Sequence, residues 1–327
     1  MNEKKASPPR HDPKVVKALR NFAISISVFN ILGYTLFGFE QPWLYPFIAL
    51  ATAYTVEFGL EIVGARVEGR VPRFLGGGAR GVLEFLYPAT ITALALNMLI
   101  YVNDRVWVMM FGVVVAVGGK WVLRAPVRGR MRHFMNPSNL GIAVILLLFP
   151  WAAIAPPYEF TEHLSGLADW IVPAVILVAG TILNAKLTGR VWLIAGWLGV
   201  FVLQAIVRGL VLDTAILGAL ATMTGVAFVL FTNYMITDPG TSPSKPASQV
   251  AFGGGIALLY GFFAGAGITY GLFFATALGC LIRGGFLWSM HFAERTAAGA
   301  ARESAVSADG SAAPASDPAD GRKVVPA

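Results

Sequence analysis

Long apolar stretches separated by short polar loops follow one another along most of the chain. Most are long enough to cross a bilayer as a helix, which takes roughly 17–25 residues. The pattern predicts an all-α, polytopic integral membrane protein with about ten transmembrane helices. The ten stretches cover residues 21–39, 43–65, 83–102, 106–123, 138–155, 170–187, 191–207, 214–236, 249–266 and 268–286.

The loop charges predict how these helices are oriented. If the N-terminus is cytoplasmic and the helices alternate, all of the 25 basic residues except Arg105 and Arg208 fall on the cytoplasmic side. Cytoplasmic loops of membrane proteins carry such an excess of Lys and Arg. We therefore expect a multi-pass protein of a bacterial inner membrane, with an even number of spans and both termini in the cytoplasm.

Composition supports this class and excludes others. Of 327 residues, 56% are hydrophobic and only 13% are charged, whereas soluble domains carry about 25% charged residues. The net charge of +7 is confined to particular loops, so the expected partner is the lipid bilayer and not nucleic acid. A single cysteine, Cys280, excludes an intramolecular disulfide and a cysteine-based metal site, and the four histidines lack metal-ligand spacing. No metal is expected.

Three regions are predicted along the chain. Residues 1–20 form a basic cytoplasmic N-terminus, and residues 21–286 form the ten-helix transmembrane domain. Residues 292–327 are rich in Ala, Ser, Gly, Asp and Pro, which predicts a disordered cytoplasmic tail.

Two proline-containing loops on the predicted cytoplasmic side have unusual local chemistry. The first prolyl loop, residues 133–141, reads HFMNPSNLG, and the second prolyl loop, residues 233–248, reads NYMITDPGTSPSKPAS. Asn136, Asp238 and Ser242 each precede a proline, as an N-cap residue precedes a proline at the first helical position. Helix starts of this kind present free N–H groups that attract anions.

The two loops therefore predict a cytoplasmic anion site, for a flavin phosphate or an acidic partner surface; the alternative is that both are simple turns. In the site interpretation, Asp238 is a cap and the other polar atoms surround the anion, with Arg128, Arg130 and Arg132 adding positive charge. The candidate residues are Asn136, Pro137, Ser138, Asn139, Thr237, Asp238, Pro239, Thr241, Ser242 and Lys245.

The same segments carry a family resemblance. HFMNPSNLG, TDPGTSPSKP and QVAFGGGIALLYGFFAGAG resemble the RnfD and NqrB membrane subunits of ion-translocating electron-transport complexes. FAISISVFNILGYTLFGFEQPW and ATAYTVEFGLE resemble the UnbU family of enediyne biosynthesis clusters, within the same superfamily. The resemblance covers roughly residues 12–286 and implies an RnfD/NqrB-like fold of ten helices.

The resemblance also bears on cofactors. RnfD and NqrB hold FMN through a threonine in an SGAT-like motif of an outside loop, but this chain has Ser165-Gly166-Leu167-Ala168 there. Thr161, the one threonine in that loop, has different flanking residues. Covalent FMN is therefore not expected, and any FMN is expected to be non-covalent.

Acidic residues lie inside the predicted spans. Glu57 and Glu61 are four residues apart on one helix face, and Glu84 begins the next helix. Ionisable groups within a span are costly and mark pathways or internal pairs. Glu57 is the candidate ion-coupling residue; the alternative is a structural pair with Lys120 or a loop arginine.

Three functions remain open. The resemblance implies a redox subunit that supports enediyne antibiotic biosynthesis by membrane electron transfer, together with other membrane or biosynthetic redox proteins. The alternatives are a transporter of a small molecule or ion, with Glu57 as its coupling group, and a membrane anchor without chemistry. No catalytic residue can be assigned, so enzymatic activity of the chain alone is an open question.

Overall fold

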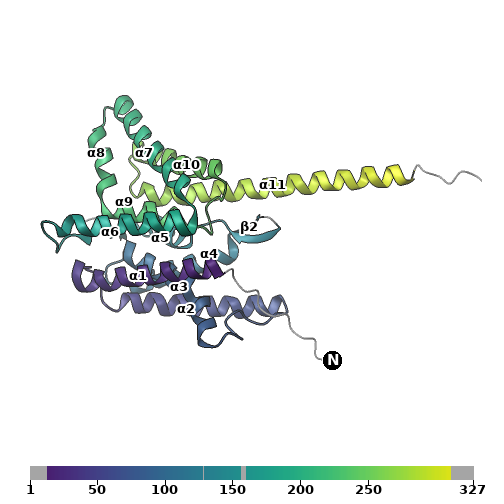
Figure 1. Cartoon of the computed structure of the whole chain (residues 1–327), viewed down its shortest axis with the longest axis horizontal. Helices are drawn as coiled ribbons and strands as arrows, with labels where there is room; N and C mark the ends of the chain where they lie inside the picture. The colour runs from purple at the N-terminus through teal and green to yellow at the C-terminus, as the bar shows by residue number, and fades with distance from the viewer. Residues whose placement is uncertain (1–12, 128, 156–159, 311–327) are drawn as a thin grey trace, which may run out of the picture.

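The computed structural model describes residues 13–127, 129–155 and 160–310, with side chains through residue 300, and the fold is all-α (Figure 1). The first half contains α1 (Pro13–Leu32), η1 (Gly33–Phe37), α2 (Tyr45–Val67), α3 (Gly78–Leu99), α4 (Val106–Val122) and α5 (Pro137–Leu148). The second half contains α6 (Ala168–Leu183), η3 (Asn184–Thr188), α7 (Val191–Leu212), α8 (Ile216–Ala221), η4 (Thr222–Thr224), α9 (Val226–Leu230), η5 (Phe231–Met235), α10 (Pro246–Gly265) and α11 (Gly271–Gly310).

Two small antiparallel ribbons connect helices in the first half. Strands β1 (Ile100–Tyr101) and β4 (Ala153–Ile154) pair with each other, and strands β2 (Arg124–Val127) and β3 (Arg130–His133) form a hairpin between α4 and α5. Arg124 pairs with His133 in the hairpin register. The hairpin places Arg130 and Arg132 on β3, directly before the first prolyl loop.

The described helices confirm a multi-pass membrane protein. Seven of them are long and apolar enough to cross a bilayer, and the number is eight if the pair Ile216–Thr224 and Val226–Met235, bent by 67°, is counted as one span. Two shorter apolar helices, Val106–Val122 and Pro137–Leu148, occupy the remaining predicted stretches. Every predicted stretch thus contains a helix or the bent pair. Whether all ten cross the membrane remains a prediction.

The two halves are built in the same order. α1 continues into a π-helical turn that ends at Gly38, and α6 continues into a π-helical turn that ends at Gly189, both glycines having positive φ. In the first half α2 packs against α4, and α4 against α5; in the second half α7 packs against α10, and α10 against α11. Five segments thus repeat, a feature that residue patterns alone did not indicate.

An asparagine joins corresponding helices in each half. On α3, Asn97 donates to Oδ1 of Asn30 on α1 at 3.0 Å. After α6, Asn184 donates to the carbonyl of Asn233 in η5 at 2.8 Å. All four side chains are buried. Such hydrogen bonds between helices remove polar groups from contact with hydrocarbon and help to fix helix pairs.

The helices α7 and α10 approach each other closely at two glycines. A Cβ atom on Gly253 would lie 2.4 Å from the Leu193 carbonyl oxygen, and one on Gly196 would lie 2.6 Å from that of Val250. Small residues allow the two backbones to approach in this way. The opposite surfaces of the spans expose large apolar side chains, among them Leu210 and Phe262, which contact the bilayer.

The C-terminal helix is longer than the sequence predicted. α11 continues through Gly310, beyond the bundle (Figure 1), so the predicted disorder is wrong for residues 292–310. Alanine, the strongest helix former, recurs throughout this segment, which explains why it continues as a helix despite having little to bury. The predicted disorder of residues 311–327, and residues 1–12 of the predicted N-terminal region, lie outside the described residues.

Candidate functional site

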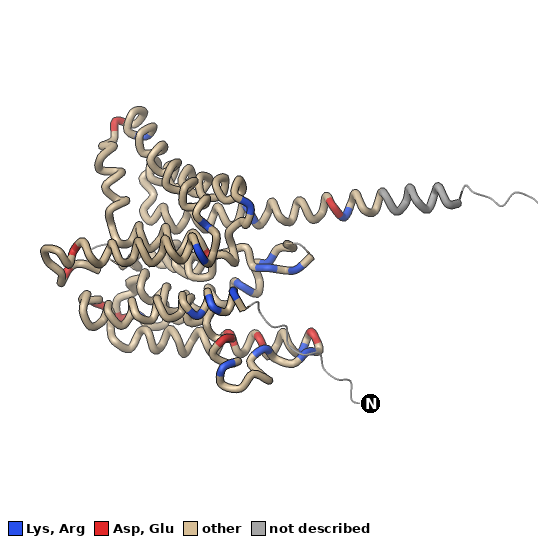
Figure 2. The backbone as a smooth tube through the Cα atoms, in the orientation of Figure 1, with Lys and Arg blue, Asp and Glu red and all other residues tan. Residues whose placement is uncertain are grey.

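Many lysine and arginine positions of the backbone lie at one end of the bundle, here called the basic end (Figure 2). It includes the loop after α2, the β2–β3 hairpin, the start of α7 and the second prolyl loop. These segments are far apart in sequence, but the alternating helices bring them to the same end. The candidate site lies here.

The first prolyl loop has the predicted cap. Asn136 precedes Pro137 at the start of α5, and its side chain accepts a hydrogen bond from the Asn139 N–H at 2.9 Å. Ser138 donates to the same side-chain oxygen at 3.0 Å. Asn136 and Ser138 are buried. This helix start is fixed and inward-facing, so its cap is satisfied by the protein.

The second prolyl loop does not have the predicted caps. No helix begins at Pro239 or Pro243; α10 begins at Pro246, and its N-cap residue, Lys245, makes no side-chain cap bond. Asp238 instead accepts hydrogen bonds from the Gly240 N–H and the Thr241 hydroxyl, both at 3.0 Å. Aspartate commonly closes turns in this way, and here the turn prevails over the helix start.

The prediction that the two loops meet is confirmed. The Asn136 side chain donates to the carbonyl of Met235 at 3.0 Å, across 99 positions of sequence. Gly240 lies so close to the hairpin that an added Cβ would be 2.8 Å from Nε2 of His133. The hairpin, the first prolyl loop and the second prolyl loop therefore form one surface.

Arg190 holds the second prolyl loop in place. Its Nε donates to the Ser242 hydroxyl at 2.7 Å, and its two terminal nitrogens donate to the carbonyls of Thr188 and Pro239 at 3.1 and 3.4 Å. Ser242 in turn donates to the Asp238 carbonyl at 2.6 Å. Only 8% of Arg190 is exposed, so its guanidinium stabilises the loop from within.

A basic pocket opens where these segments meet. Its volume is about 270 Å³. Four arginines and a histidine contribute to its walls, from the hairpin, the start of α7 and α11. The lining residues are Val127, Arg130, Arg132, His133, Arg190, Pro239, Gly240, Ser242, Ser244 and Arg283.

The charges around the pocket are mostly positive. Burial lowers the pKa of His133, as do Lys120 and Arg124, while Asp238 and Glu57 oppose the shift. This lowered pKa favours the neutral imidazole. Guanidinium groups stay protonated throughout the physiological range, so the pocket attracts anions through its arginines.

Most of the predicted site residues do not line the pocket. Asn139 and Thr237 are fully buried; Asn139 donates to the Phe273 carbonyl and Thr237 to that of Asn233. Lys245 is exposed and does not line the pocket. Of the predicted set, Pro239 and Ser242 line it, as do Arg130 and Arg132; Arg128 lies outside the described residues.

Among the lining residues that were not predicted are two arginines, Arg190 and Arg283. Each follows or interrupts an apolar run and looks like an ordinary cytoplasmic boundary residue. Gly284 allows Phe134 to pack against α11, where an added Cβ would lie 2.5 Å from that ring, and Trp288 donates to the Arg124 carbonyl at 3.0 Å. These contacts bring Arg283 to the pocket. The one signal in the sequence was Gly284, the small residue next to Arg283, which indicates a close helix contact at that position.

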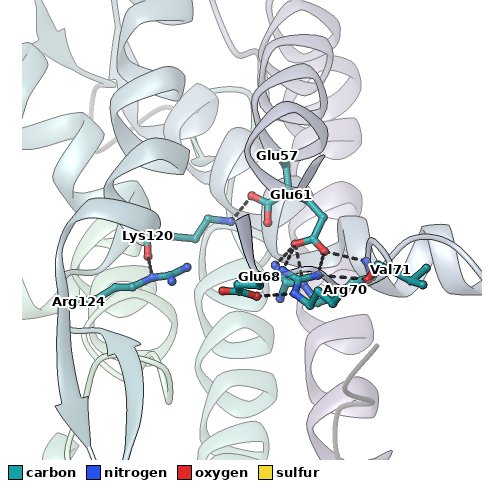
Figure 3. A network of polar contacts seen from close by, with 8 residues as sticks. Glu57, Glu61, Glu68, Arg70, Val71, Lys120 and Arg124 are labelled. Carbon is teal, nitrogen blue, oxygen red and sulfur yellow. Dashed lines mark hydrogen bonds and ion pairs between the residues drawn. The ribbon is translucent and has the colours of Figure 1, made fainter. Parts of the chain in front are cut away.

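Glu57 is paired with Lys120 (Figure 3). Lys120 Nζ lies 2.6 Å from the Glu57 carboxylate, and the two residues are 5% and 9% exposed. The pair joins α2 to α4. Of the two interpretations that the sequence left open, this geometry matches the structural pair.

The other two acidic candidates are also paired. Glu61 is fully buried and bonds the Arg70 guanidinium, the Arg73 N–H at 2.7 Å and Nε of Arg73 at 2.9 Å. Hydrogen bonding to Glu61 raises the pKa of Arg70. Glu84 pairs with Arg80 at 2.8 Å in a largely exposed setting. The Glu61 contacts fix the loop after α2 to that helix, whereas the Glu84 pair lies within α3.

The segment that corresponds to the flavin-bearing loop of the resembled family precedes α6. It therefore lies at the other end of that helix from Arg190 and the basic pocket. Ser165, Gly166 and Leu167 are exposed, Gly166 has positive φ, and α6 begins at Ala168. Residues 156–159 lie outside the described part. Among the described residues, no three His, Cys, Asp or Glu side chains cluster as metal ligands would.

No family model matches this chain, and no curated protein is similar enough to count as a match.

We expect Asn136→Ala to destabilise the protein by about 2 kcal/mol, because it removes a helix cap worth about 1 kcal/mol and a buried hydrogen bond of similar size. Asn136→Ser keeps a capping oxygen but is too short to reach Met235, so about half of the loss is expected. Chemical unfolding of the detergent-solubilised protein measures both. Equal stability of Asn136→Ala and the unaltered protein would contradict this role.

Removing either partner of the Glu57–Lys120 pair should destabilise the protein by about 3–5 kcal/mol, because an uncompensated charge stays buried. Glu57→Gln and Lys120→Met should each do so, and the double variant should regain much of the loss. Arg80→Gln, which breaks an exposed pair, is the control and should change little. Additive single effects in the double variant would show that the pair is not coupled.

Proposed function

We propose that this chain is a membrane-embedded subunit of the RnfD/NqrB type, of its UnbU branch, and that it supports enediyne biosynthesis by electron transfer through a non-covalently held flavin. The observation that carries the proposal is the basic pocket. The two motifs that resemble RnfD and NqrB lie far apart in sequence, yet their loops meet and form or support this pocket. A phosphorylated cofactor such as FMN matches its charge.

Two further features support the proposal. The repeated order of packing gives five segments in each half, which fits ten spans even though α4 and α5 are short. The exposed Ser165-Gly166-Leu167 segment offers no threonine for a covalent flavin. Electron donors and acceptors would then be neighbouring redox proteins at the cytoplasmic face.

The transport alternative receives less support. Its coupling group, Glu57, is paired with Lys120 and is almost completely buried. A coupling carboxylate must exchange its proton or ion with water during transport, and this pair would have to separate to do so. The anchor alternative gives no reason for the arginine-lined pocket.

The topology that we propose has ten spans in a bacterial inner membrane, with both termini cytoplasmic. Reporter fusions at residue 163 and after residue 295 should report outside and inside positions, respectively, since the positive loops would be retained in the cytoplasm. A cytoplasmic signal at residue 163 would contradict the topology.

The flavin proposal predicts that the protein purified in mild detergent shows flavin absorption. After acid precipitation the flavin should stay in the supernatant, because no covalent bond holds it. The protein band on a denaturing gel should lack flavin fluorescence. Absence of flavin from protein purified from its own biosynthetic host, together with failure to bind added FMN, would contradict the proposal; a fluorescent band would contradict the non-covalent form.

A further inference from the structure

The arginines around the basic pocket differ in what they bond. Each of the three side-chain nitrogens of Arg190 donates a hydrogen bond to a protein oxygen. The acceptors are on Ser242, Thr188 and Pro239. Arg283 presents a buried terminal nitrogen, Nη1, that has no hydrogen-bond partner among the described residues. A buried cationic donor without an acceptor is unfavourable. A ligand oxygen in the pocket would satisfy it.

Two more arginines line the same pocket and are exposed. Arg130 and Arg132 lie on strand β3 of the hairpin, and both are exposed pocket-lining residues. Arg283 approaches from α11, and Arg190 from the start of α7. A ligand in the pocket would thus be surrounded by guanidinium groups from three separate elements, which is how a compact anion is held from several sides.

The charge balance favours an anion with more than one negative charge. Asp238 is the acidic group whose charge acts on His133, Arg190 and Arg283, and its carboxylate is already bonded by Gly240 and Thr241. Four arginines against one aspartate leave a positive excess at the pocket. Guanidinium groups match the oxygens of phosphate in paired hydrogen bonds, better than an ammonium does.

We propose that the basic pocket is a phosphate site, in which Nη1 of Arg283 is the principal free donor and Arg130 and Arg132 complete the contacts. The ligand class is a phosphate ester, carried either by a soluble phosphomonoester such as FMN or by an anionic phospholipid headgroup. Basic pockets between helices at the cytoplasmic surface bind such headgroups. The inference rests on the site of the proposed function, but it does not require the ligand to be a flavin.

Titration calorimetry with inorganic phosphate tests the site on the full-length protein in detergent. Arg283→Gln should weaken phosphate binding at least about tenfold, as expected for the loss of a charge-assisted hydrogen bond. Arg283→Lys should retain part of the affinity, and Arg132→Gln, an exposed change, should weaken it several-fold. Arg295→Gln removes the same charge from an exposed position further along α11 and should leave affinity unchanged.

Unaltered phosphate affinity in both Arg283→Gln and Arg132→Gln would overturn the proposal. So would an equal loss in Arg295→Gln, because it would show a diffuse charge effect and not a site. Melting temperatures measured without phosphate identify any variant that fails to fold, and in that case Arg132→Gln decides.

Competition identifies the source of the phosphate. FMN should displace inorganic phosphate, and riboflavin should not, if the ligand is a soluble phosphomonoester. Phosphatidylglycerol in nanodiscs should abolish phosphate binding, and phosphatidylcholine should not, if the ligand is a lipid headgroup. If neither FMN nor phosphatidylglycerol competes, or if riboflavin competes as well as FMN, the proposal fails.

The outcomes separate this inference from the electron-transfer proposal. A protein without flavin that still binds phosphate through Arg283 contradicts electron transfer through FMN and leaves the phosphate site standing. If the protein contains flavin but its phosphate affinity is unchanged by both Arg283→Gln and Arg132→Gln, only the phosphate site is contradicted.

Discussion

The fold depends on the cost of placing an unpaired charge among apolar helices. Glu57 enters the bundle on α2 and is met by Lys120 of α4, and Glu61, one turn further, is met by Arg70 and Arg73. A charge there would otherwise be far from water, so each needs a partner of opposite sign. These pairs connect the end of α2 to α4 and to the following loop. They thereby fix the part of the bundle on which the basic hairpin is mounted.

Structural features could be predicted from the sequence where they depend on interactions between residues close together in the chain. Each apolar stretch contains a helix or the bent pair, because helix length and side-chain apolarity are properties of consecutive residues. The extension of α11 to Gly310 was not predicted, because that segment is not an apolar stretch. The cap at Asn136 could also be predicted, because Asn139, its partner, is three residues away. Asp238 has the same local appearance but closes a turn onto Gly240 and Thr241. Two local hydrogen-bonding patterns compete there, and surrounding packing chooses between them.

Features that depend on tertiary contacts could not be predicted. The bend between α8 and α9 and the pairing of α1 with α3 follow from neighbours that no residue pattern specifies. Arg190 and Arg283 each looked like a boundary arginine of the positive-inside kind. Their convergence depends on α11 packing against the first prolyl loop through Gly284 and Phe134. The basic loop was therefore visible in the sequence, while the pocket was not.

Two arginines at this pocket, Arg190 and Arg283, have different roles. Arg190 donates hydrogen bonds to three protein oxygens and thereby holds the second prolyl loop in place. Its removal would therefore lower the stability of the loop. Arg283 has Nη1 unpaired within the described residues. Arg208 also has an unpaired buried nitrogen, Nε, but it does not line this pocket, so incomplete bonding alone does not indicate a ligand. What distinguishes Arg283 is that it lines a cavity with a positive excess, together with two further, exposed arginines, Arg130 and Arg132. A site of this construction selects for charge and oxygen geometry before it selects for the rest of the molecule. A phosphate ester therefore meets its requirements whether it is attached to a flavin or to a lipid.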